Sequence, residues 1–196
     1  MNKYLTVVFV AVVLLCAFAP TSAKADPLGT CIGICSFLYS GGGYSNIGAP
    51  FFSAYGINNN GEIVGGDPNF SQISVDNAGV FTMISVPGLQ PFMGVNDAGQ
   101  IVGSVHTGGT TIQAFVYNAG TFDRFSVPSA SETFAYGIDN SGDIVGTYYN
   151  GTNHGFVDIG GVITSVDVPG AVATSAQGIN NAGDIVGTYC ATYTNC

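Results

Sequence analysis

The sequence predicts an all-β protein, a propeller-like repeat of four blades with four short strands each. The first observation is a decapeptide, Gly-Ile-Asn-Asn-Asn-Gly-Glu-Ile-Val-Gly at 56–65, that returns in close variants from Gly94, Gly137 and Gly178. Its period of about 40 residues is typical of propeller blades. The second is that no long apolar pattern with helical spacing follows residue 25. The third is a composition with 29 glycines and only 8% charged residues.

Residues 1–25 are expected to be a cleaved secretory signal peptide. Lys3 precedes an apolar run at 5–18, and Ala23-Lys24-Ala25 has the small-x-small form of a cleavage site. An uncleaved anchor is disfavoured because the apolar run is short and is followed by a proline and polar residues. We therefore expect a secreted protein, extracellular or periplasmic, whose residues 26–196 form a single β-repeat domain without membrane insertion after cleavage.

Each copy of the decapeptide is predicted to form a β-hairpin. An apolar residue leads into a turn rich in Asn and Asp, a glycine follows, and Ile-Val begins the next strand. Asn and Asp bond to nearby backbone groups, and glycine adopts a positive φ without a Cβ clash. The pattern is typical of a hairpin with three to five loop residues and a bulge. The turn glycines are Gly61, Gly99, Gly142 and Gly183.

A second pattern alternates with the decapeptide and predicts another hairpin in each repeat. It runs from a strand, with an aromatic start in three copies, through a glycine-containing turn to a proline. The proline ends the second strand because it has no N–H for the ladder. Its copies span 37–50, 74–87, 115–128 and 156–169. The expected hairpin pairs therefore lie around 37–66, 74–104, 115–147 and 156–188.

The order of the hairpins predicts that the two chain ends meet. The chain opens with the hairpin of the second pattern and closes with a decapeptide hairpin, so the first would complete the last blade. Such a ring has no exposed sheet edges. Two alternatives remain open at this point: an open β-repeat array, and half of a larger propeller that self-association completes.

Four cysteines of the expected mature chain are disulfide candidates: Cys31, Cys35, Cys190 and Cys196. An even count outside the cytosol favours disulfides. Pairing between the two clusters would join the chain ends and, in the chain-entropy model, contribute about 4–5 kcal/mol. Pairing within each cluster would close small loops instead. A zinc site is the rival interpretation, although the spacing does not resemble a CxxC ribbon.

The repeats resemble the extracellular HAF-repeat family, a group of secreted β-repeat proteins of unknown function. The decapeptide and a Val-Pro-Gly-Ala motif at 168–171 carry the resemblance. So do His154-Gly155-Phe156 and Gln113-Ala114-Phe115, which stand where the family has its His-Ala-Phe triplet. The resemblance covers essentially all of residues 26–196. It implies secretion and a β-repeat fold, and it transfers no catalytic residue.

The charge balance excludes one class of partner. Without residues 1–25, Arg124 is the only Lys or Arg left against 12 Asp and Glu residues. Such a surface repels the phosphates of nucleic acids and of anionic lipids, so nucleic-acid binding is not expected. Cations, cationic partners and neutral glycans remain compatible.

Three acidic residues are candidate cation ligands. The position after the turn glycine carries Glu62, Asp143 and Asp184 in three repeats and Gln100 in the other. In a ring these residues would lie on one face, and Ca²⁺ takes oxygen ligands of this kind. The alternative is that the Asn and Asp residues shape the turns and the acids aid solubility. Because the turns lack a full calcium-loop ligand series, the sequence requires no cofactor.

Tyr148, Tyr149 and His154 are candidate glycan-binding residues, because they lie in the least symmetric segment and aromatic rings can form a platform for sugars. Packing at the rim is the alternative. No Ser-His-Asp pattern or histidine-rich metal cluster is visible, since His106 and His154 are the only histidines. We expect a non-enzymatic binding or surface and matrix component with an extracellular glycan or protein partner. The alternative is a hydrolase or lyase of extracellular polysaccharide, with an asymmetric carboxylate pair.

Overall fold

The computed structural model describes residues 35–47, 53–67 and 69–192. Within these residues the chain forms 16 strands and no helix, so no described helix could cross a membrane. The expected all-β repeat fold is confirmed. The expected signal peptide, residues 1–25, lies outside the described residues.

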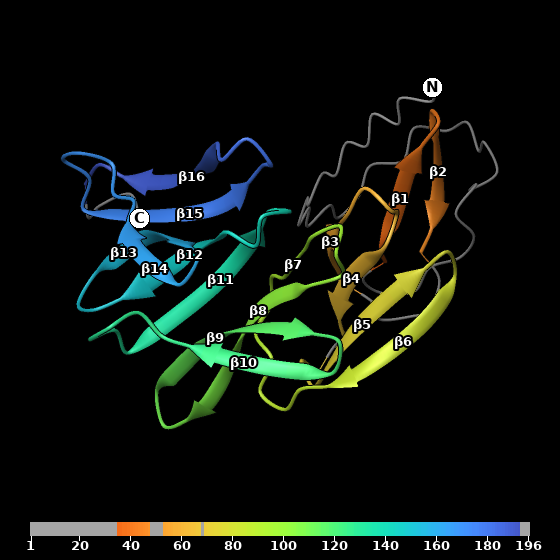
Figure 1. The fold of residues 1–196 in the computed structure, drawn as a ribbon, viewed down its shortest axis with the longest axis horizontal. Helices are drawn as coiled ribbons and strands as arrows, with labels where there is room; N and C mark the ends of the chain where they lie inside the picture. The colour runs from red at the N-terminus through yellow and green to blue at the C-terminus, as the bar shows by residue number, and fades with distance from the viewer. Residues whose placement is uncertain (1–34, 48–52, 68, 193–196) are drawn as a thin grey trace, which may run out of the picture.

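The strands follow one another as antiparallel hairpins (Figure 1). Their bounds are β1 Phe37–Ser40, β2 Gly43–Asn46, β3 Ser53–Ile57, β4 Ile63–Gly66, β5 Gln72–Asn77, β6 Val80–Ser85, β7 Gly94–Val95, β8 Ile101–Gly108, β9 Thr111–Asn118, β10 Thr121–Phe125, β11 Glu132–Ile138, β12 Ile144–Tyr149, β13 Asn153–Ile159, β14 Val162–Ser165, β15 Ala173–Ile179 and β16 Ile185–Cys190.

The strands group into three four-stranded units, β3–β6, β7–β10 and β11–β14, with a two-stranded end unit on either side, β1–β2 and β15–β16. A single parallel bridge between Glu132 and Ile112 joins the second and third units into one eight-stranded sheet. Each four-stranded unit combines a decapeptide hairpin with the hairpin that follows it. The sequence alone had left open where the boundary between units falls.

Both kinds of hairpin have the turns that their residues predict. In the decapeptide hairpins the glycine has a positive φ, for example 83° at Gly61 and 89° at Gly142. The second hairpin of each repeat closes with a two-residue turn in which both central residues have positive φ, as in type I′ turns. These turns are Gly41-Gly42, Ala78-Gly79, Ala119-Gly120 and Gly160-Gly161.

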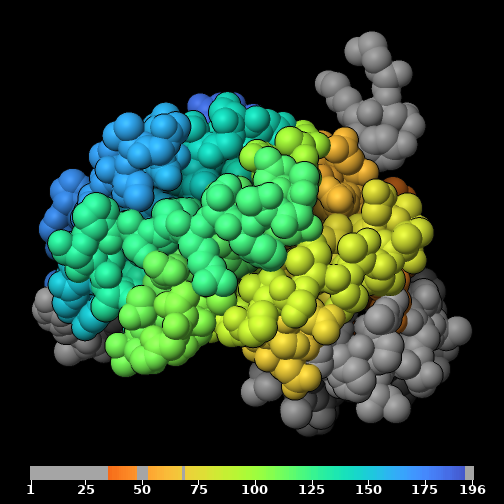
Figure 2. Space-filling model, turned by 60° about the horizontal axis from the view of Figure 1, so that its bottom comes forward, coloured from red at the N-terminus to blue at the C-terminus, as the bar shows by residue number. Residues whose placement is uncertain are grey.

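Apolar side chains between neighbouring units form the core. Val64 and Ile73 of the first unit belong to one buried cluster with Ile101 and Phe115 of the second. In Figure 2 the units follow one another around the molecule, from yellow through green to blue, without a gap in this face. The protein is therefore held together mainly by packing between successive units.

In the second and third four-stranded units a glycine on the second strand makes room for an aromatic ring on the third strand. A Cβ atom on Gly103 would lie 2.8 Å from Cζ of Phe115, and one on Gly146 would lie 2.7 Å from Cε1 of Phe156. Both phenylalanines are fully buried. The last glycine of the decapeptide thus has a packing role.

The first strands of successive units approach closely through the glycine that opens each decapeptide. A Cβ atom on Gly94 would lie 2.9 Å from the carbonyl oxygen of Tyr136 and 3.1 Å from Cα of Gly137. A Cβ atom on Gly137 would lie 3.3 Å from Cα of Gly178. Side chains at these positions would hold the units apart.

The described residues do not form the expected closed ring, because β1–β2 and β15–β16 are not paired with each other. The β1–β2 unit packs on β3–β4, where Leu38 and Ile47 contact Ala54 and Ile57. Figure 1 shows β15–β16 at the other end of the molecule, beyond the three four-stranded units. The described chain therefore has the open form shared by both alternatives to a ring, an open array and half of a larger propeller.

The cysteine candidates follow these two ends. Cys35 precedes β1 and Cys190 ends β16, and the two strands lie at opposite ends of the molecule. Cys31 and Cys196 lie outside the described residues. The pairing of the four cysteines stays a prediction.

Gly94→Ala is expected to lower the free energy of unfolding by about 2–3 kcal/mol, because the new methyl group meets backbone atoms of β11 that cannot move independently. Urea unfolding would measure the change. The control is Gly43→Ala in β2, where the nearest atom to a new Cβ lies 3.9 Å away. We expect the control to change stability by less than about 0.5 kcal/mol, and equal effects of the two substitutions would contradict the close approach.

Candidate functional site

In the first two decapeptide turns the leading Asn connects its own unit to the next. The side-chain oxygen of Asn58 accepts hydrogen bonds from the backbone N–H groups of Asn60 and Glu62, which shapes the turn. Its amide nitrogen donates to Glu62 Oε2 and to the carbonyl oxygen of Asn96 in the next unit, both at 3.0 Å. Asn96 in turn donates to the carbonyl oxygen of Asp139 at 3.0 Å.

The second Asn or Asp of each turn forms a parallel row of contacts. The carboxylate of Asp97 accepts hydrogen bonds from the backbone and side chain of Asn59, both at 2.8 Å, and from the side chain of Asn140 at 2.7 Å. These bonds hold the pKa of Asp97 below its usual value; the side chain of Asn59 contributes most, followed by that of Asn140. The backbone N–H of Asn140 then donates to Asn181 Oδ1 at 3.0 Å.

The three candidate cation ligands lie within these turns. Glu62 and Asp184 accept hydrogen bonds from Asn58 and Asn180 at 3.0 Å, and the backbone N–H of Asp143 donates to Asp139 at 2.9 Å. The neutral Gln100 accepts the same bond, from Asn96, at 2.8 Å. The shape of the turn therefore accounts for this position without a metal. Among the described residues no three His, Cys, Asp or Glu side chains converge as a metal site, and calcium binding stays a prediction.

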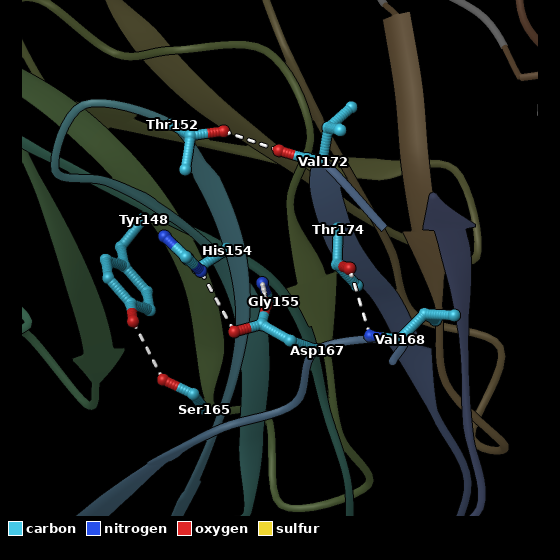
Figure 3. A network of polar contacts seen from close by, with 9 residues as sticks. All are labelled: Tyr148, Thr152, His154, Gly155, Ser165, Asp167, Val168, Val172 and Thr174. Carbon is cyan, nitrogen blue, oxygen red and sulfur yellow. Dashed lines mark hydrogen bonds and ion pairs between the residues drawn. The ribbon is translucent and has the colours of Figure 1, made fainter. Parts of the chain in front are cut away.

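Two of the three candidate glycan-binding residues meet between β12 and β13 (Figure 3). The rings of Tyr148 and His154 stack with centroids 5.0 Å apart and an interplanar angle of 20°. The hydroxyl of Tyr148 lies 2.7 Å from Ser165 Oγ, and His154 Nδ1 lies 2.9 Å from Asp167 Oδ2. The network ties β12 and β13 to β14 and the segment after it.

Tyr149 does not join this pair. It follows Tyr148 directly on β12, so its side chain points to the opposite face of the strand. Tyr148 is only 8% exposed, whereas Tyr149 is 39% exposed. In the preceding unit Gln113 and Ser126 make the contact that corresponds to His154 and Asp167, with Nε2 and Oγ 3.4 Å apart. The network is thus part of the repeat architecture, and glycan binding by these residues stays a prediction.

Sequence reasoning missed a row of aromatic side chains that crosses three units. This aromatic row consists of Tyr55 on β3, Phe92 just before β7, and Phe134 and Tyr136 on β11. Ring centroids are 5.5 Å apart for Tyr55 and Phe92, and 6.1 Å apart for Phe92 and Tyr136. Phe134 and Tyr136 stack at 6.1 Å. The available signal was that both tyrosines immediately precede the opening glycine of a decapeptide, where β3 and β11 have a bulge.

Phe92 has an unfavourable backbone conformation and an exposed ring. Its φ is +75°, a region that bulky residues rarely adopt and that costs about 1–3 kcal/mol. Its side chain is 46% exposed, while the next residue, Met93, is 2% exposed in the core. The turn before β7 therefore places methionine inside and leaves the aromatic ring at the surface between two tyrosines.

The tyrosine hydroxyls of the aromatic row stay neutral. Burial raises the pKa of Tyr55, and burial with the nearby negative charge of Glu132 raises the pKa of Tyr136. Each hydroxyl also has a side-chain hydrogen-bond partner, Ser53 for Tyr55 and Thr147 for Tyr136, and a protonated tyrosine hydroxyl can both accept and donate. A row of flat apolar rings with neutral donors suits an uncharged ligand that has both apolar and hydroxyl-bearing faces.

Comparisons with known proteins find similarity in fold only. No protein-family model matches the chain, and no curated protein matches it. A structure described as a streptogramin B lyase shares 20% identity over 72% of this chain and 55% of its own, with a TM-score of 0.43. A virginiamycin B lyase from Staphylococcus aureus shares 16% identity over 71% of this chain and 56% of its own, also with a TM-score of 0.43. The chain thus spans little more than half the length of these two structures.

Asp97→Asn is expected to destabilise the protein by about 1 kcal/mol at pH 7, because one carboxylate acceptor becomes an amide donor facing two Asn donors, at a site where solvent weakens the bonds. Since the folded-state pKa of Asp97 is lowered, its stabilisation is complete above the unfolded value of about 3.9 and is lost as the pH falls through the folded value. The stability difference between wild type and variant should therefore shrink in acid.

Chemical unfolding at several pH values would measure this difference. Asp123→Asn is the matched control, since Asp123 is an exposed acid on β10 outside the turns. We expect it to change stability by less than about 0.5 kcal/mol. A pH-independent cost of Asp97→Asn would show that the carboxylate does not hold the turns together.

Proposed function

We propose that the protein is a secreted, non-enzymatic binding protein whose aromatic row holds a neutral extracellular glycan. Phe92 carries the proposal. It keeps an aromatic ring 46% exposed at a φ of +75°, where glycine would relieve the backbone. Folding gains little from such a residue, whereas binding gains an aromatic surface between Tyr55 and Tyr136. Strained residues of this kind cluster at binding sites.

The chemistry of the row selects for neutral sugars. The C–H faces of a pyranose ring pack on aromatic rings, and its hydroxyl groups accept hydrogen bonds from tyrosine. Polyanionic glycans are disfavoured, because residues 26–196 carry Arg124 as their one Lys or Arg against 12 acids. An extracellular setting is supported by the signal-like residues 1–25 and by the resemblance of the repeats to HAF-repeat proteins.

A second candidate function is hydrolysis or elimination on an extracellular polysaccharide. The observation that favours it is the His154–Asp167 pair, because a carboxylate on one ring nitrogen orients the imidazole as a general base. The His154 side chain is 27% exposed and so is accessible to a ligand. Activity on a polysaccharide panel that His154→Gln abolishes would support this function over simple binding. Gln is the matched replacement, since Gln113 stands at this position in the preceding unit.

Phe92→Gly is expected to weaken glycan binding at least tenfold, about 1.4 kcal/mol, and to leave stability within about 1 kcal/mol of wild type, because the relieved backbone offsets the lost ring contacts. A glycan array and pull-down with insoluble polysaccharides would identify the ligand, and calorimetric titration would measure its affinity.

Tyr149→Ala is the control, because it removes an exposed aromatic ring outside the aromatic row. We expect it to leave the affinity unchanged. Loss of binding in Tyr149→Ala but not in Phe92→Gly would move the site to β12 and its loop. A protein that binds no glycan on the array or in the pull-down would overturn the proposed function.

A further inference from the structure

The same five residues are buried in one unit and exposed in another. Ile-Val-Gly-Thr-Tyr stands at 144–148 in β12 and again at 185–189 in β16. All five are buried in β12, whereas in β16 the first is half-buried and the other four are exposed. The valine shows the contrast best, since Val145 is 0% exposed and Val186 is 67% exposed. The sequence of β16 is therefore that of an interior strand without its cover.

The missing cover is the third strand of a four-stranded unit. In the complete units the second strand pairs with the third: β4 with β5, β8 with β9, and β12 with β13. Among the described residues β16 pairs only with β15. Gly187 corresponds to Gly103 and Gly146, which lie under aromatic rings, but it is exposed in β16, and the three described atoms nearest to a Cβ built on it belong to Ser175 and Ala176.

The β1–β2 unit lacks the first and second strands of a four-stranded unit. It aligns with the third and fourth strands of a complete unit, so Phe37 takes the place of Phe115 and Phe156. Those two rings are 0% exposed, but Phe37 is 42% exposed. In the described chain β1 pairs only with β2 and has no second strand beside it. One end of the protein thus has two inner strands, and the other has two outer strands.

The apolar cluster beneath β1–β2 also lacks one member. Leu38 and Ile47 pack there with Ala54, Ile57, Ile63 and Phe81, and no described residue of a second strand beside β1 takes part. The corresponding cluster at the other end contains Val157, Val166, Ala176, Ile179, Ile185 and, in addition, Val145 from the second strand. By repeat position, the residue that would complete the first cluster is Val186.

We propose that β15–β16 of one chain and β1–β2 of a second copy of this chain combine into one four-stranded unit. The register of the complete units pairs Gly187 with Phe37 and Val186 with Leu38, as Gly146 pairs with Phe156 and Val145 with Val157. Neither β16 nor β1 contains a charged residue, so two acidic copies can meet there without repulsion at the contact. In a two-fold dimer both ends of both chains are completed, and no open edge remains.

The turn contacts continue across the same junction. In three successive repeats a backbone N–H donates to the side-chain oxygen of the next turn, ending with Asn140 to Asn181. The first strand of the second copy would follow β15, which places Asn59 of that copy next to Asn181. Gly178 has room for this approach, since a Cβ there would meet only the side chain of Val186.

Sedimentation velocity of the purified protein tests the proposal, and a dimer is the expected species. Val186→Asp should convert the dimer to a folded monomer, because Val186 is 67% exposed in one chain. Val162→Asp is the matched control: Val162 is 68% exposed on β14, outside the junction, and the variant should stay dimeric. Circular dichroism confirms that both variants are folded. A monomeric wild type, or a Val186→Asp variant that still dimerises, would overturn the proposal.

A cross-linking experiment separates pairing between chains from ring closure within one chain. Leu38→Cys and Val186→Cys are made as two single variants and mixed under oxidising conditions. Directly paired residues on antiparallel strands have Cα atoms about 4.5–5.5 Å apart, which suits a disulfide. A covalent heterodimer that contains the new bond supports the proposal. If the double variant instead forms this bond only within one chain, the protein closes on itself and the proposal fails.

Discussion

The close approach of backbones at the opening glycines is the constraint on which the fold depends. Gly56, Gly94 and Gly137 each bring the first strand of one unit within contact of the next. This approach positions the apolar faces of the units against each other and brings each turn within hydrogen-bonding distance of the following one. The buried clusters and the row of turn contacts are two results of the same spacing. A chain with so few charged residues can be stable in this way because most of its interactions are short and neutral.

Local features were predictable from sequence, and the grouping of the hairpins was not. The turns follow from residues such as Gly61 and the Ala78-Gly79 pair, whose backbone preferences act over a few positions. Which hairpins share a sheet depends on strand pairing across the connections, and nothing in those connections distinguishes the two groupings. The open arrangement of the units could likewise not be predicted from the sequence, because it depends on how each unit is oriented on its neighbour.

In the candidate site, too, individual residues could be predicted from the sequence, but the contacts between strands could not. Tyr148 and His154 could be singled out because their segment breaks the repeat, but their stacking depends on the pairing of β12 with β13. The aromatic row escaped attention because its members come from three repeats and occupy different positions. Phe92 precedes its glycine by two residues, whereas Tyr55 and Tyr136 precede theirs by one. The three rings come together only because the positive φ of Phe92 turns its ring to the surface and places Met93 in the core.

One residue difference among the turns affects the contacts between successive units. Asn58 and Asn96 each use a side-chain amide to hold the following unit, but the third repeat has Asp139, whose side chain lacks the amide N–H group that donates in the other two. The seam between the third unit and β15–β16 therefore lacks the amide-to-carbonyl hydrogen bond that Asn58 and Asn96 make at the other two. This seam relies instead on hydrogen bonds that two threonines of the third unit donate, from Thr147 to Ser175 Oγ at 2.6 Å and from Thr152 to the carbonyl oxygen of Val172 at 2.7 Å.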